Sequence, residues 1–301
     1  MVESKDAASQ MDVKKVLSTK WPSYDVKLSN NDLILYALGV GFSQNPLNAA
    51  DFKFTYENDS EFQAFATMPS VIAHRQSDLV LNIPGFPAFN PMMLLYGEEN
   101  LEFYKPITSD LNLVVEERIA DVADKGKMTG LTEESLIKNK DTGETLVKIL
   151  RTLMIRGVGG YGHKGGAVAV HYPEIPKRAP DAVLESASSP SQALLYRLNG
   201  DLNPLHVDPD MAALGGFEKP IIHGLCSSGF TARMVYEKFC NGDPKNLAKF
   251  STRFLSHVLP GETYVVEIWK DGNTLIFQTK TKERGKVAVR GFAELRAQAK
   301  L

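Results

Sequence analysis

One order of motifs occurs twice in this chain, and this repeat constrains the fold more than any other feature of the sequence. A Leu-Tyr-x-Leu motif followed by Asn-Pro-Leu lies at residues 35–47 and again at residues 195–205. In each half, three segments with the composition of β-strands come later in the chain. One motif alone could recur by chance, but the same order in both halves predicts a duplication that folds as two similar halves.

The segments that end each half are typical of antiparallel hairpins. They are rich in valine, isoleucine, threonine and tyrosine, which strands favour, and turns that contain glycine separate them. The predicted strands are residues 111–124, 128–140 and 144–156 in the first half and 263–270, 274–282 and 286–296 in the second.

A stretch rich in glycine and proline separates the two halves. It begins at Gly157 and ends at Pro190, and such a density of these residues interrupts regular structure. We therefore expect an N-terminal half at residues 1–160, a linker at residues 161–190 and a C-terminal half at residues 191–301.

The second half contains one strong helix candidate at residues 224–240. Its apolar side chains recur at a spacing of three to four residues, which places them on one helical face. The small residues Ser228, Gly229 and Ala232 would let this helix approach a sheet closely. One long helix with an antiparallel meander indicates an α+β fold rather than a parallel sheet.

Composition excludes several classes of protein. The 301 residues are 43% hydrophobic and 23% charged, which excludes a largely disordered or collagen-like chain. Lysine and arginine number 34 against 36 aspartate and glutamate, so no basic excess favours nucleic-acid binding. The longest apolar run, residues 33–42, is too short for a membrane span, which needs about 18 residues.

The densest group of chemically useful side chains lies at residues 198–208. Asp201, Asn203 and His206 fall close together, and Pro204 prevents a continuous helix. This segment should be a turn that projects short polar side chains, and an aspartate with a histidine can act as acid and base. Alternatively, Asp201 and Asn203 only satisfy backbone groups of the turn.

The residues that follow favour the catalytic interpretation. Residues 215–225 lead into the predicted helix and place Gly224 at its start. Free N–H groups at a helix N-terminus favour negative charge, and a glycine there lets a ligand approach the backbone. An acid–base pair beside such a helix start is suited to the chemistry of an enolate.

These two strings resemble the signature of the enoyl-CoA hydratase 2 (MaoC-like) family. The matching residues are Gly200-Asp201-x-Asn203-Pro204-x-His206 and then Pro220-Ile221-Ile222-His223-Gly224-Leu225. The likeness covers most of the chain, and the tandem arrangement is similar to the hydratase 2 part of peroxisomal multifunctional enzymes type 2. It implies a double hot-dog fold, in which each half wraps a curved antiparallel sheet around a long helix.

The resemblance also implies an activity. Members of the family are hydro-lyases that convert trans-2-enoyl-CoA to (3R)-3-hydroxyacyl-CoA in peroxisomal fatty-acid β-oxidation, with acyl-CoA as the partner molecule and without a cofactor or metal ion. Asp201 and His206 would form the acid–base dyad, with neither assigned as the acid or the base. Asn203 would orient the water or the dyad, and the Gly224 N–H would bind the thioester oxygen.

Four further residues would contact coenzyme A by the same resemblance: Tyr96, Gly97, Lys125 and Phe254. Family members often carry His-Gly-Glu where this chain has Tyr96-Gly97-Glu98. Lys125 could meet a phosphate, but a lysine beside a hairpin glycine is equally explained as solvated surface.

The first half repeats the frame of the site without its dyad. Asn45-Pro46-Leu47 is followed by Asn48 instead of histidine. The counterpart of Gly200-Asp201 reads Gly39-Val40 or Gly41-Phe42, which offers no carboxylate. The resemblance implies that this half accommodates the acyl chain instead.

The last three residues predict a cellular address. Ala299-Lys300-Leu301 is a near variant of Ser-Lys-Leu, which directs proteins to peroxisomes through an import receptor. We therefore expect a peroxisomal protein, and we also expect it to be a homodimer.

Two other patterns are set aside. Gly157, Gly159 and Gly162 match a dinucleotide fingerprint, but a proline-rich stretch follows instead of the helix that such a site needs. His206, Asp208 and His223 could be considered as metal ligands, but no cysteine pair or His-Glu-x-x-His helix supports zinc. The remaining histidines are isolated in the sequence and are assigned no role: His74, His163, His171 and His257.

Two rival functions remain open at this stage. One is another hot-dog enzyme, either a thioesterase or a dehydratase that acts on a different carrier. The other is a non-catalytic module that binds acyl-CoA.

Overall fold

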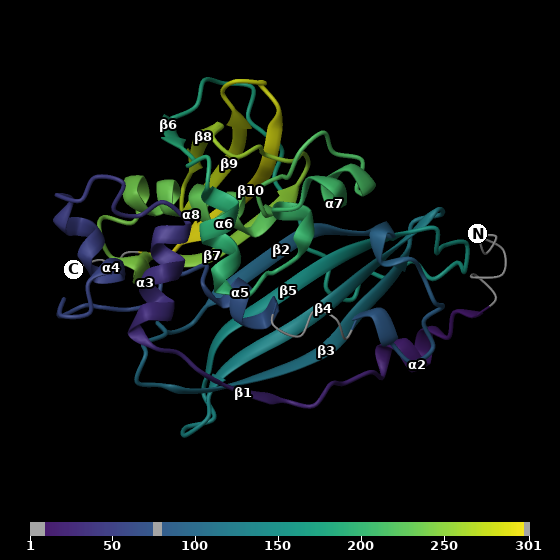
Figure 1. Ribbon diagram of the computed structural model, residues 1–301. Helices are drawn as coiled ribbons and strands as arrows, with labels where there is room; N and C mark the ends of the chain where they lie inside the picture. The colour runs from purple at the N-terminus through teal and green to yellow at the C-terminus, as the bar shows by residue number, and fades with distance from the viewer. Residues whose placement is uncertain (1–9, 75–79, 298–301) are drawn as a thin grey trace.

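Ten strands form one continuous antiparallel sheet in the computed structural model, which describes residues 10–74 and 80–297 (Figure 1). The strands of the first half are β1 (Tyr24–Lys27), β2 (Leu94–Phe103), β3 (Asn112–Asp124), β4 (Met128–Asn139) and β5 (Thr145–Arg156). Those of the second half are β6 (Ala182–Ala187), β7 (Leu247–Phe254), β8 (Thr263–Asp271), β9 (Thr274–Thr281) and β10 (Val287–Leu295).

The sheet topology confirms the duplication. The strand order is β1-β3-β4-β5-β2-β7-β10-β9-β8-β6. From either edge inward, each half runs through its first, third, fourth, fifth and second strand. The two second strands, β2 and β7, pair at the centre, where Glu98 lies opposite Arg253 and Glu102 lies opposite Lys249.

The six predicted strands are confirmed to within one residue at every end. The sequence did not reveal β1, β2, β6 and β7. Charged residues alternate irregularly with apolar ones in β2 and β7, because these central strands carry polar groups on a face that the linker and the other half cover.

The repeated Leu-Tyr-x-Leu motifs meet where the halves join. The first lies in α3 (Asn30–Gly39) and the second begins in α6 (Gln192–Tyr196). The rings of Tyr36 and Tyr196 are fully buried and their centroids lie 6.2 Å apart. The Gln192 side chain donates a 2.8 Å hydrogen bond to the Gly39 carbonyl. The helices that carry the two motifs are therefore held against each other.

The predicted helix of the second half is confirmed as α8 (Gly224–Phe239), which packs on the sheet at β7, β8 and β10. Its residues from Leu225 to Tyr236 are all buried. A Cβ at Gly229 would lie 2.4 Å from a Val40 methyl group. This glycine therefore lets α8 approach the end of α3 instead of the sheet. Ser228 does face the sheet as expected, with its hydroxyl 3.4 Å from that of Thr252 in β7.

The first half differs from the expectation of a long helix in each half. The helix that precedes β2 in the first half, where α8 precedes β7 in the second, is the five-residue α5 (Pro69–Ala73). A cluster of aromatic rings from α4 (Phe52–Thr55) and the turns on either side of it fills the remaining space, with Phe42, Phe54 and Phe65 packed against Tyr236 of α8. Both halves thus share one hydrophobic core around α8. The double hot-dog fold is confirmed, with one central helix shortened.

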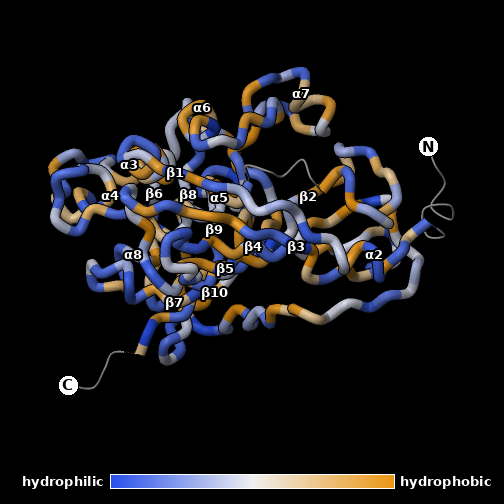
Figure 2. The backbone as a smooth tube through the Cα atoms, turned by 90° about the horizontal axis from the view of Figure 1, so that it is seen from below, coloured by the Kyte–Doolittle hydropathy of each residue, from blue (hydrophilic) through white to orange (hydrophobic). Residues whose placement is uncertain are grey.

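The remaining short helices are α2 (Val13–Leu17) and α7 (Pro209–Leu214). Helices α3, α4, α6 and α8 gather on one side of the sheet (Figure 1). Hydrophobic and hydrophilic residues alternate repeatedly along the chain where it passes through the sheet (Figure 2). Within the described residues, no helix has the length and apolar character that would let it cross a membrane.

Residues 157–181, between β5 and β6, contain no helix or strand. The glycines of the apparent dinucleotide fingerprint lie here. Backbone N–H groups of Gly160 and Gly162 donate to the Asp124 carboxylate at 3.0 and 2.6 Å. Farther along, the Tyr172 hydroxyl lies 3.0 Å from oxygen acceptors on both Asn100 and Thr252. These contacts anchor the linker across the junction of the two halves.

Candidate active site

A tight turn after α6 presents Asp201 and His206. Gly200 has a φ of 123°, which a side chain would strain, and the chain reverses there. Asn203 then caps a short 3-10 helix at Pro204–His206, since its side-chain oxygen accepts from the Leu205 N–H at 3.0 Å. Its own backbone N–H donates to Asp201 Oδ1 at 3.2 Å. Asn203 therefore shapes the turn and holds the carboxylate.

Asp201, His206 and His223 form the centre of the site. Side-chain ligand atoms of the three residues lie within 4.8 Å of one another. His206 Nδ1 donates to the Ile221 carbonyl at 2.8 Å, so in the neutral ring Nε2 is the unprotonated nitrogen. His223 Nε2 donates to the Asp201 carbonyl at 3.2 Å. The two imidazoles stack with centroids 3.7 Å apart.

The electrostatics of the site set the charges of the dyad. Burial would raise the pKa of Asp201, but the contact with His74 and the charges of His74, His223 and His206 outweigh it and lower this pKa. Burial lowers the pKa of His206. Burial and the neighbouring His206 lower the pKa of His223 to about 3. Near neutral pH the site therefore holds an ionised Asp201 beside two neutral histidines.

His74 brings the first half into this site. It is the residue at the C-terminal end of α5, and its Nε2 lies 3.4 Å from Asp201 Oδ2. The expectation that His74 is isolated is wrong, because the fold places the end of α5 against the turn of the other half. The sequence carried no signal for this contact. His223, in contrast, lies within the second motif, where it could have been recognised.

Gly224 begins α8 and is exposed. No side chain caps this helix end, and no acidic residue lies in its first turn. A Cβ on Gly224 would lie 3.2 Å from the Phe254 ring. The predicted helix start is thus an open set of N–H donors in contact with Phe254, and such a set favours a developing negative charge.

The residues expected to bind coenzyme A lie along one path from this helix start. The rings of Phe254 and Tyr96 pack edge to face with centroids 5.3 Å apart. The Tyr96 hydroxyl, however, donates to Glu99 at 3.0 Å, so this hydroxyl is directed inward. Gly97 packs against Met154, where a Cβ would lie 2.9 Å from the Met154 Cγ.

Lys125 lies farther along the same path, exposed at the turn between β3 and β4. Its Cε lies 3.8 Å from the position that a Cβ would take on Gly130, and the Met154 sulfur is equally close to that position at 3.7 Å. Gly97 and Lys125 therefore both lie close to the Met154 side chain on the sheet surface.

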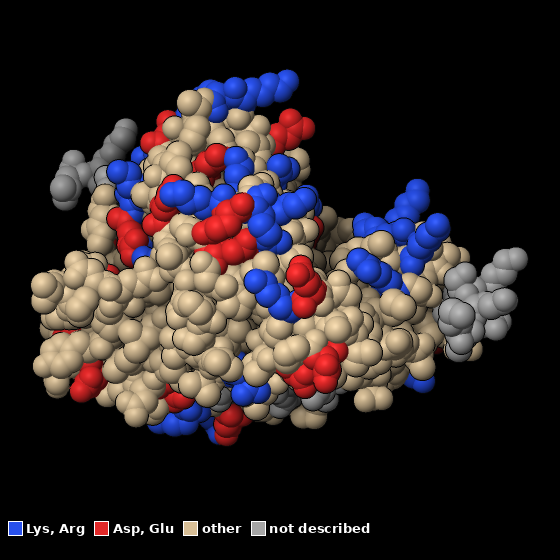
Figure 3. Space-filling view, turned by 45° about the horizontal axis from the view of Figure 1, so that its top comes forward, with Lys and Arg blue, Asp and Glu red and all other residues tan. Residues whose placement is uncertain are grey.

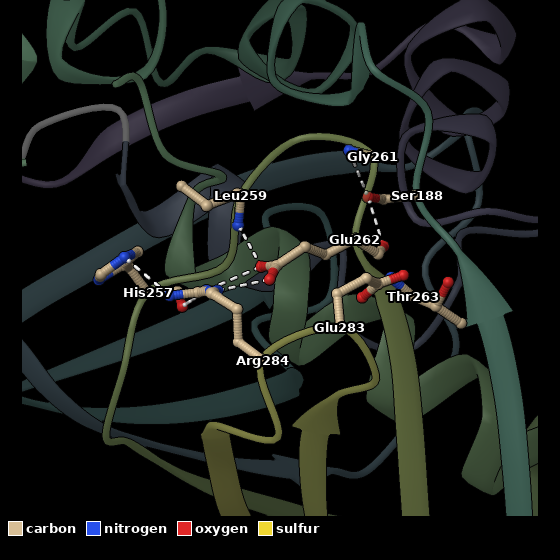
Figure 4. A network of polar contacts seen from close by, with 8 residues as sticks. All are labelled: Ser188, His257, Leu259, Gly261, Glu262, Thr263, Glu283 and Arg284. Atoms are coloured by element: carbon tan, nitrogen blue, oxygen red, sulfur yellow. Dashed lines mark hydrogen bonds and ion pairs between the residues drawn. The ribbon is translucent and has the colours of Figure 1, made fainter. Parts of the chain in front are cut away.

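A salt-bridge network holds the segment that carries His223 (Figure 4). Arg284 donates to the Glu262 carboxylate at 2.7 Å and to the His257 carbonyl at 2.8 Å. The same carboxylate accepts from the Leu259 N–H at 2.7 Å. The loop fixed in this way supplies the carbonyl of Val258 that accepts from the Ile222 N–H at 2.8 Å. The network thus fixes the loop against which Ile222, the residue before His223, is hydrogen-bonded.

The arrangement suits acid–base chemistry better than a shared metal ion. The free lone pairs of His206 and His223 lie in the planes of two stacked rings, which are inclined by only 27°. Lone pairs in nearly parallel planes do not converge at the tetrahedral distances of zinc. Asp208, the third ligand considered from the sequence, instead caps α7 by accepting from the Asp210 N–H at 2.8 Å.

The first half retains the turn but not the chemistry. Asn45 makes the same side-chain hydrogen bond as Asn203, with its side-chain oxygen 3.1 Å from the Leu47 N–H, although no helix begins there. Asn48 stands in the place of His206, and its amide donates to Asp51 at 3.0 Å. When the two turns are aligned on this asparagine, Ser43 takes the place of Asp201, and its backbone N–H donates to the same Asp51.

Comparisons with known proteins match both halves. The description "MFE-2 hydratase 2 N-terminal domain" matches residues 26–157, and "MaoC like domain" matches residues 172–291. The chain is 36% identical to "Enoyl-CoA hydratase 2, peroxisomal" of Arabidopsis thaliana, with 96% of each chain covered. It is 41% identical to "Probable enoyl-CoA hydratase 2" of Dictyostelium discoideum, with 91% of this chain and 93% of the relative covered.

A solved structure supports the same family likeness. The MaoC-like dehydratase from Phytophthora capsici superposes with a TM-score of 0.85 at 34% identity, over 96% of this chain and all of that one.

Proposed function

Because this chain belongs to the enoyl-CoA hydratase 2 family of MaoC-like proteins, we propose that it adds water to trans-2-enoyl-CoA and releases (3R)-3-hydroxyacyl-CoA in peroxisomal β-oxidation. One observation carries this proposal most directly. An ionised Asp201 and a neutral His206 with an unprotonated Nε2 lie beside the open N-terminus of α8.

These groups divide the reaction between them. His206 Nε2 takes a proton from a water molecule while the water oxygen bonds to the β-carbon of the enoyl group. Negative charge then develops on the thioester oxygen, which the Gly224 N–H and the helix end stabilise. The imidazolium that forms next to the Asp201 carboxylate returns its proton to the α-carbon. The overall result adds one water across the double bond, and His206 serves first as base and then as acid.

Asn203 contributes by position in this scheme. Its cap defines the turn, and its N–H holds Asp201 Oδ1. Tyr96, Gly97 and Phe254 provide a surface for the pantetheine arm, and Lys125 provides charge for a phosphate. Basic side chains gather at one end of the face that Figure 3 displays, whereas both signs of charge are mixed over its centre.

A cavity beside α5 offers room for the acyl chain. A largely apolar cavity of about 490 Å³ lies beside Phe65 and Pro69, where α5 starts, and extends to Phe103 and Val147. His74 and the dyad lie at the other end of α5. We assign this cavity to the acyl tail, in line with the role expected for residues 1–160.

The activity can be tested by following the enoyl absorbance of short, medium and very long trans-2-enoyl-CoA, with a thiol reagent present in parallel samples. We expect the absorbance to fall with no release of free thiol. Steady thiol release would indicate a thioesterase, and binding without any change in absorbance would indicate a non-catalytic acyl-CoA-binding module.

The two equivalent asparagine hydrogen bonds allow a matched test of the division between the halves. Asn45→Ala and Asn203→Ala remove the same side-chain-to-backbone hydrogen bond, which is worth about 1 kcal/mol of unfolding free energy. We expect both variants to lose that stability in urea unfolding, but only Asn203→Ala to lower kcat on a short substrate. A similar loss of kcat in a folded Asn45→Ala protein would contradict the assignment of catalysis to the second half.

The peroxisomal assignment rests on the relatives and on the tail. Ala299-Lys300-Leu301 lies outside the described residues. Deleting these three residues should leave kcat unchanged in vitro and move a fluorescent fusion from peroxisomes to the cytosol, because the import receptor reads the tail. Peroxisomal import of the truncated protein in cells without a native copy would exclude the tail as the address.

We also propose that the protein is a homodimer. Leu194 of α6, Leu198 of the 3-10 helix that continues it and Leu202 of the turn that follows are each more than half exposed, at 51%, 59% and 59%. Exposed apolar side chains close together in the chain are suited to a contact between two copies. Sedimentation of the wild type and of a Leu198→Lys variant would test it, with a monomeric mass expected only for the variant.

A further inference from the structure

The oxygens of the Asp201 carboxylate are held from two different halves of the chain. Oδ1 accepts from the Asn203 N–H at 3.2 Å, within the same turn. Oδ2 lies 3.4 Å from Nε2 of His74, which belongs to the half without a dyad. The contact is shielded, since the His74 and Asp201 side chains are only 20% and 15% exposed.

His74 occupies a constrained place. It follows the last turn of α5, whose residues are all buried, so its backbone is held against the rest of the fold. Its other nitrogen, Nδ1, is buried and has no hydrogen-bond partner within the described residues. Asp201 is therefore the acceptor toward which the ring is directed.

Hydrogen bonds between polar residues hold α5, and with it His74, against strand β2. The His74 ring lies 6.4 Å from the Tyr96 ring, centroid to centroid. The Tyr96 hydroxyl donates to one oxygen of Glu99, and Ser70 of α5 donates to the other at 2.8 Å. This chain of contacts ties α5 to the central strand β2 and so fixes the approach of His74 to the site.

We propose that His74 is a positioning residue for the hydration reaction, and this inference rests on the proposed function. Its Nε2–H holds Asp201 Oδ2, while Asn203 holds Oδ1, so that the carboxylate keeps one orientation toward His206 and the reacting water. The first half thus takes part in catalysis through Asp201, although it has lost its own acid and base.

The pH dependence of the reaction follows from this contact. Because His74 lowers the pKa of Asp201, its removal should raise that pKa. The acid limb of kcat/KM should then move to higher pH, since protonated Asp201 cannot stabilise the imidazolium. The titratable and charged groups around His74 are Tyr96, Glu99, Glu117, Glu133, Arg151, Asp201, His206 and His223. None of them changes in the variants below.

Three variants test the proposal against wild type. His74→Ala removes the donor, His74→Gln keeps an amide N–H at a similar reach, and His171→Gln is a matched change at an exposed histidine of the linker. With a short enoyl-CoA, we expect His74→Ala to lower kcat on the order of 10–100-fold, the scale of a lost hydrogen bond to a charged group, with little change in KM. His74→Gln should recover most of kcat, and His171→Gln should match wild type.

The pH profile separates positioning from simple stability. We expect the acid limb to shift upward in His74→Ala and less in His74→Gln. A folded His74→Ala protein with the kcat and pH profile of wild type would overturn the proposal. If His74→Ala does not fold, a His74→Gln protein with the same loss of kcat as Asp201→Ala would also overturn it, because the restored donor would have no effect.

An NMR titration of the Asp201 carboxyl keeps the inference separate from the proposed function. Wild-type protein that hydrates no enoyl-CoA would remove the proposed function. Even then, the midpoint of the Asp201 titration must rise in His74→Gln or His74→Ala relative to His171→Gln. If the midpoint of the Asp201 titration does not change, the contact between His74 and Asp201 does not position the carboxylate.

Discussion

Asp201→Ala and His206→Ala should each lower kcat for hydration of a trans-2-enoyl-CoA on the order of 10²–10⁴-fold, the usual contribution of a positioned acid or base. Without His206 the site loses the unprotonated Nε2 to which the proposal assigns the proton of water. Without Asp201 the imidazolium that forms lacks the adjacent carboxylate. The measurement is steady-state turnover of a short substrate, with circular dichroism to establish that each variant is folded.

The double variant should fall little below the single ones, because groups that act as a unit are not additive. Asp208→Ala is the matched control, since Asp208 caps α7 in the same segment and is assigned no chemical role. It should lose some stability and keep kcat. Near-normal turnover in either single dyad variant would remove that residue from the mechanism.

Arg151→Met should lower the free energy of unfolding by about 3–5 kcal/mol, the usual cost of removing one partner of a buried ion pair. Arg151 is 3% exposed, and its guanidinium lies 3.4 Å from Glu133. The charge of Arg151 also lowers the pKa of Glu99, which burial raises. Removing Arg151 leaves these buried carboxylates without a compensating charge. Urea unfolding near neutral pH measures the effect.

The deficit should depend on pH in a defined direction. Burial raises the pKa of Glu133 and of Glu99 above their usual values, and loss of Arg151 would raise both further. A carboxyl with a raised folded pKa stabilises the fold below its unfolded pKa and loses that contribution as the pH rises through the folded pKa. The deficit of Arg151→Met should therefore shrink as the pH falls from 7 toward about 5.

Arg118→Met is a control in the same sheet, on β3, which β4 separates from β5. Arg118 is 45% exposed, and its partner Glu134 keeps a second cation, Lys148, at 3.2 Å, so we expect a loss of no more than about 1 kcal/mol. Equal losses of stability in the two variants would show that Arg151 does not compensate the charge of the buried carboxylates Glu133 and Glu99.

The sequence predicted those parts of the fold that local pattern determines. The strands from Asn112 to Arg156 alternate in polarity between glycine turns, and their ends were located to within one residue. The central strands β2 and β7 were missed because they pair with each other across the two halves. Each strand pairs with a partner more than 100 residues away in the sequence. Such a pairing leaves no hydrophobic period in the local sequence.

In the site, too, the sequence predicted what lies close together in the chain and missed a contact between distant segments. Asp201, Asn203 and His206 lie in one turn, and the second motif leads directly to Gly224, so the sequence brought these residues together. His74 contacts Asp201 only because α5 ends where the two halves meet. The shortening of the first-half helix was equally hidden, since the aromatic rings of Phe42, Phe54 and Phe65, from α4 and the turns around it, take up the core volume.

The stereochemistry of hydration tests the central claim most directly. The acid–base groups form one cluster, and His74 joins it at the Asp201 carboxylate instead of supplying an acid elsewhere. The hydroxyl and the α-proton must therefore reach the same face of the enoyl group. NMR and chiral analysis of the product formed in D₂O should show the (3R) alcohol with deuterium added syn. A (3S) product, or deuterium anti to the hydroxyl, would contradict the account, because either would require a different substrate orientation or an acid on the opposite face.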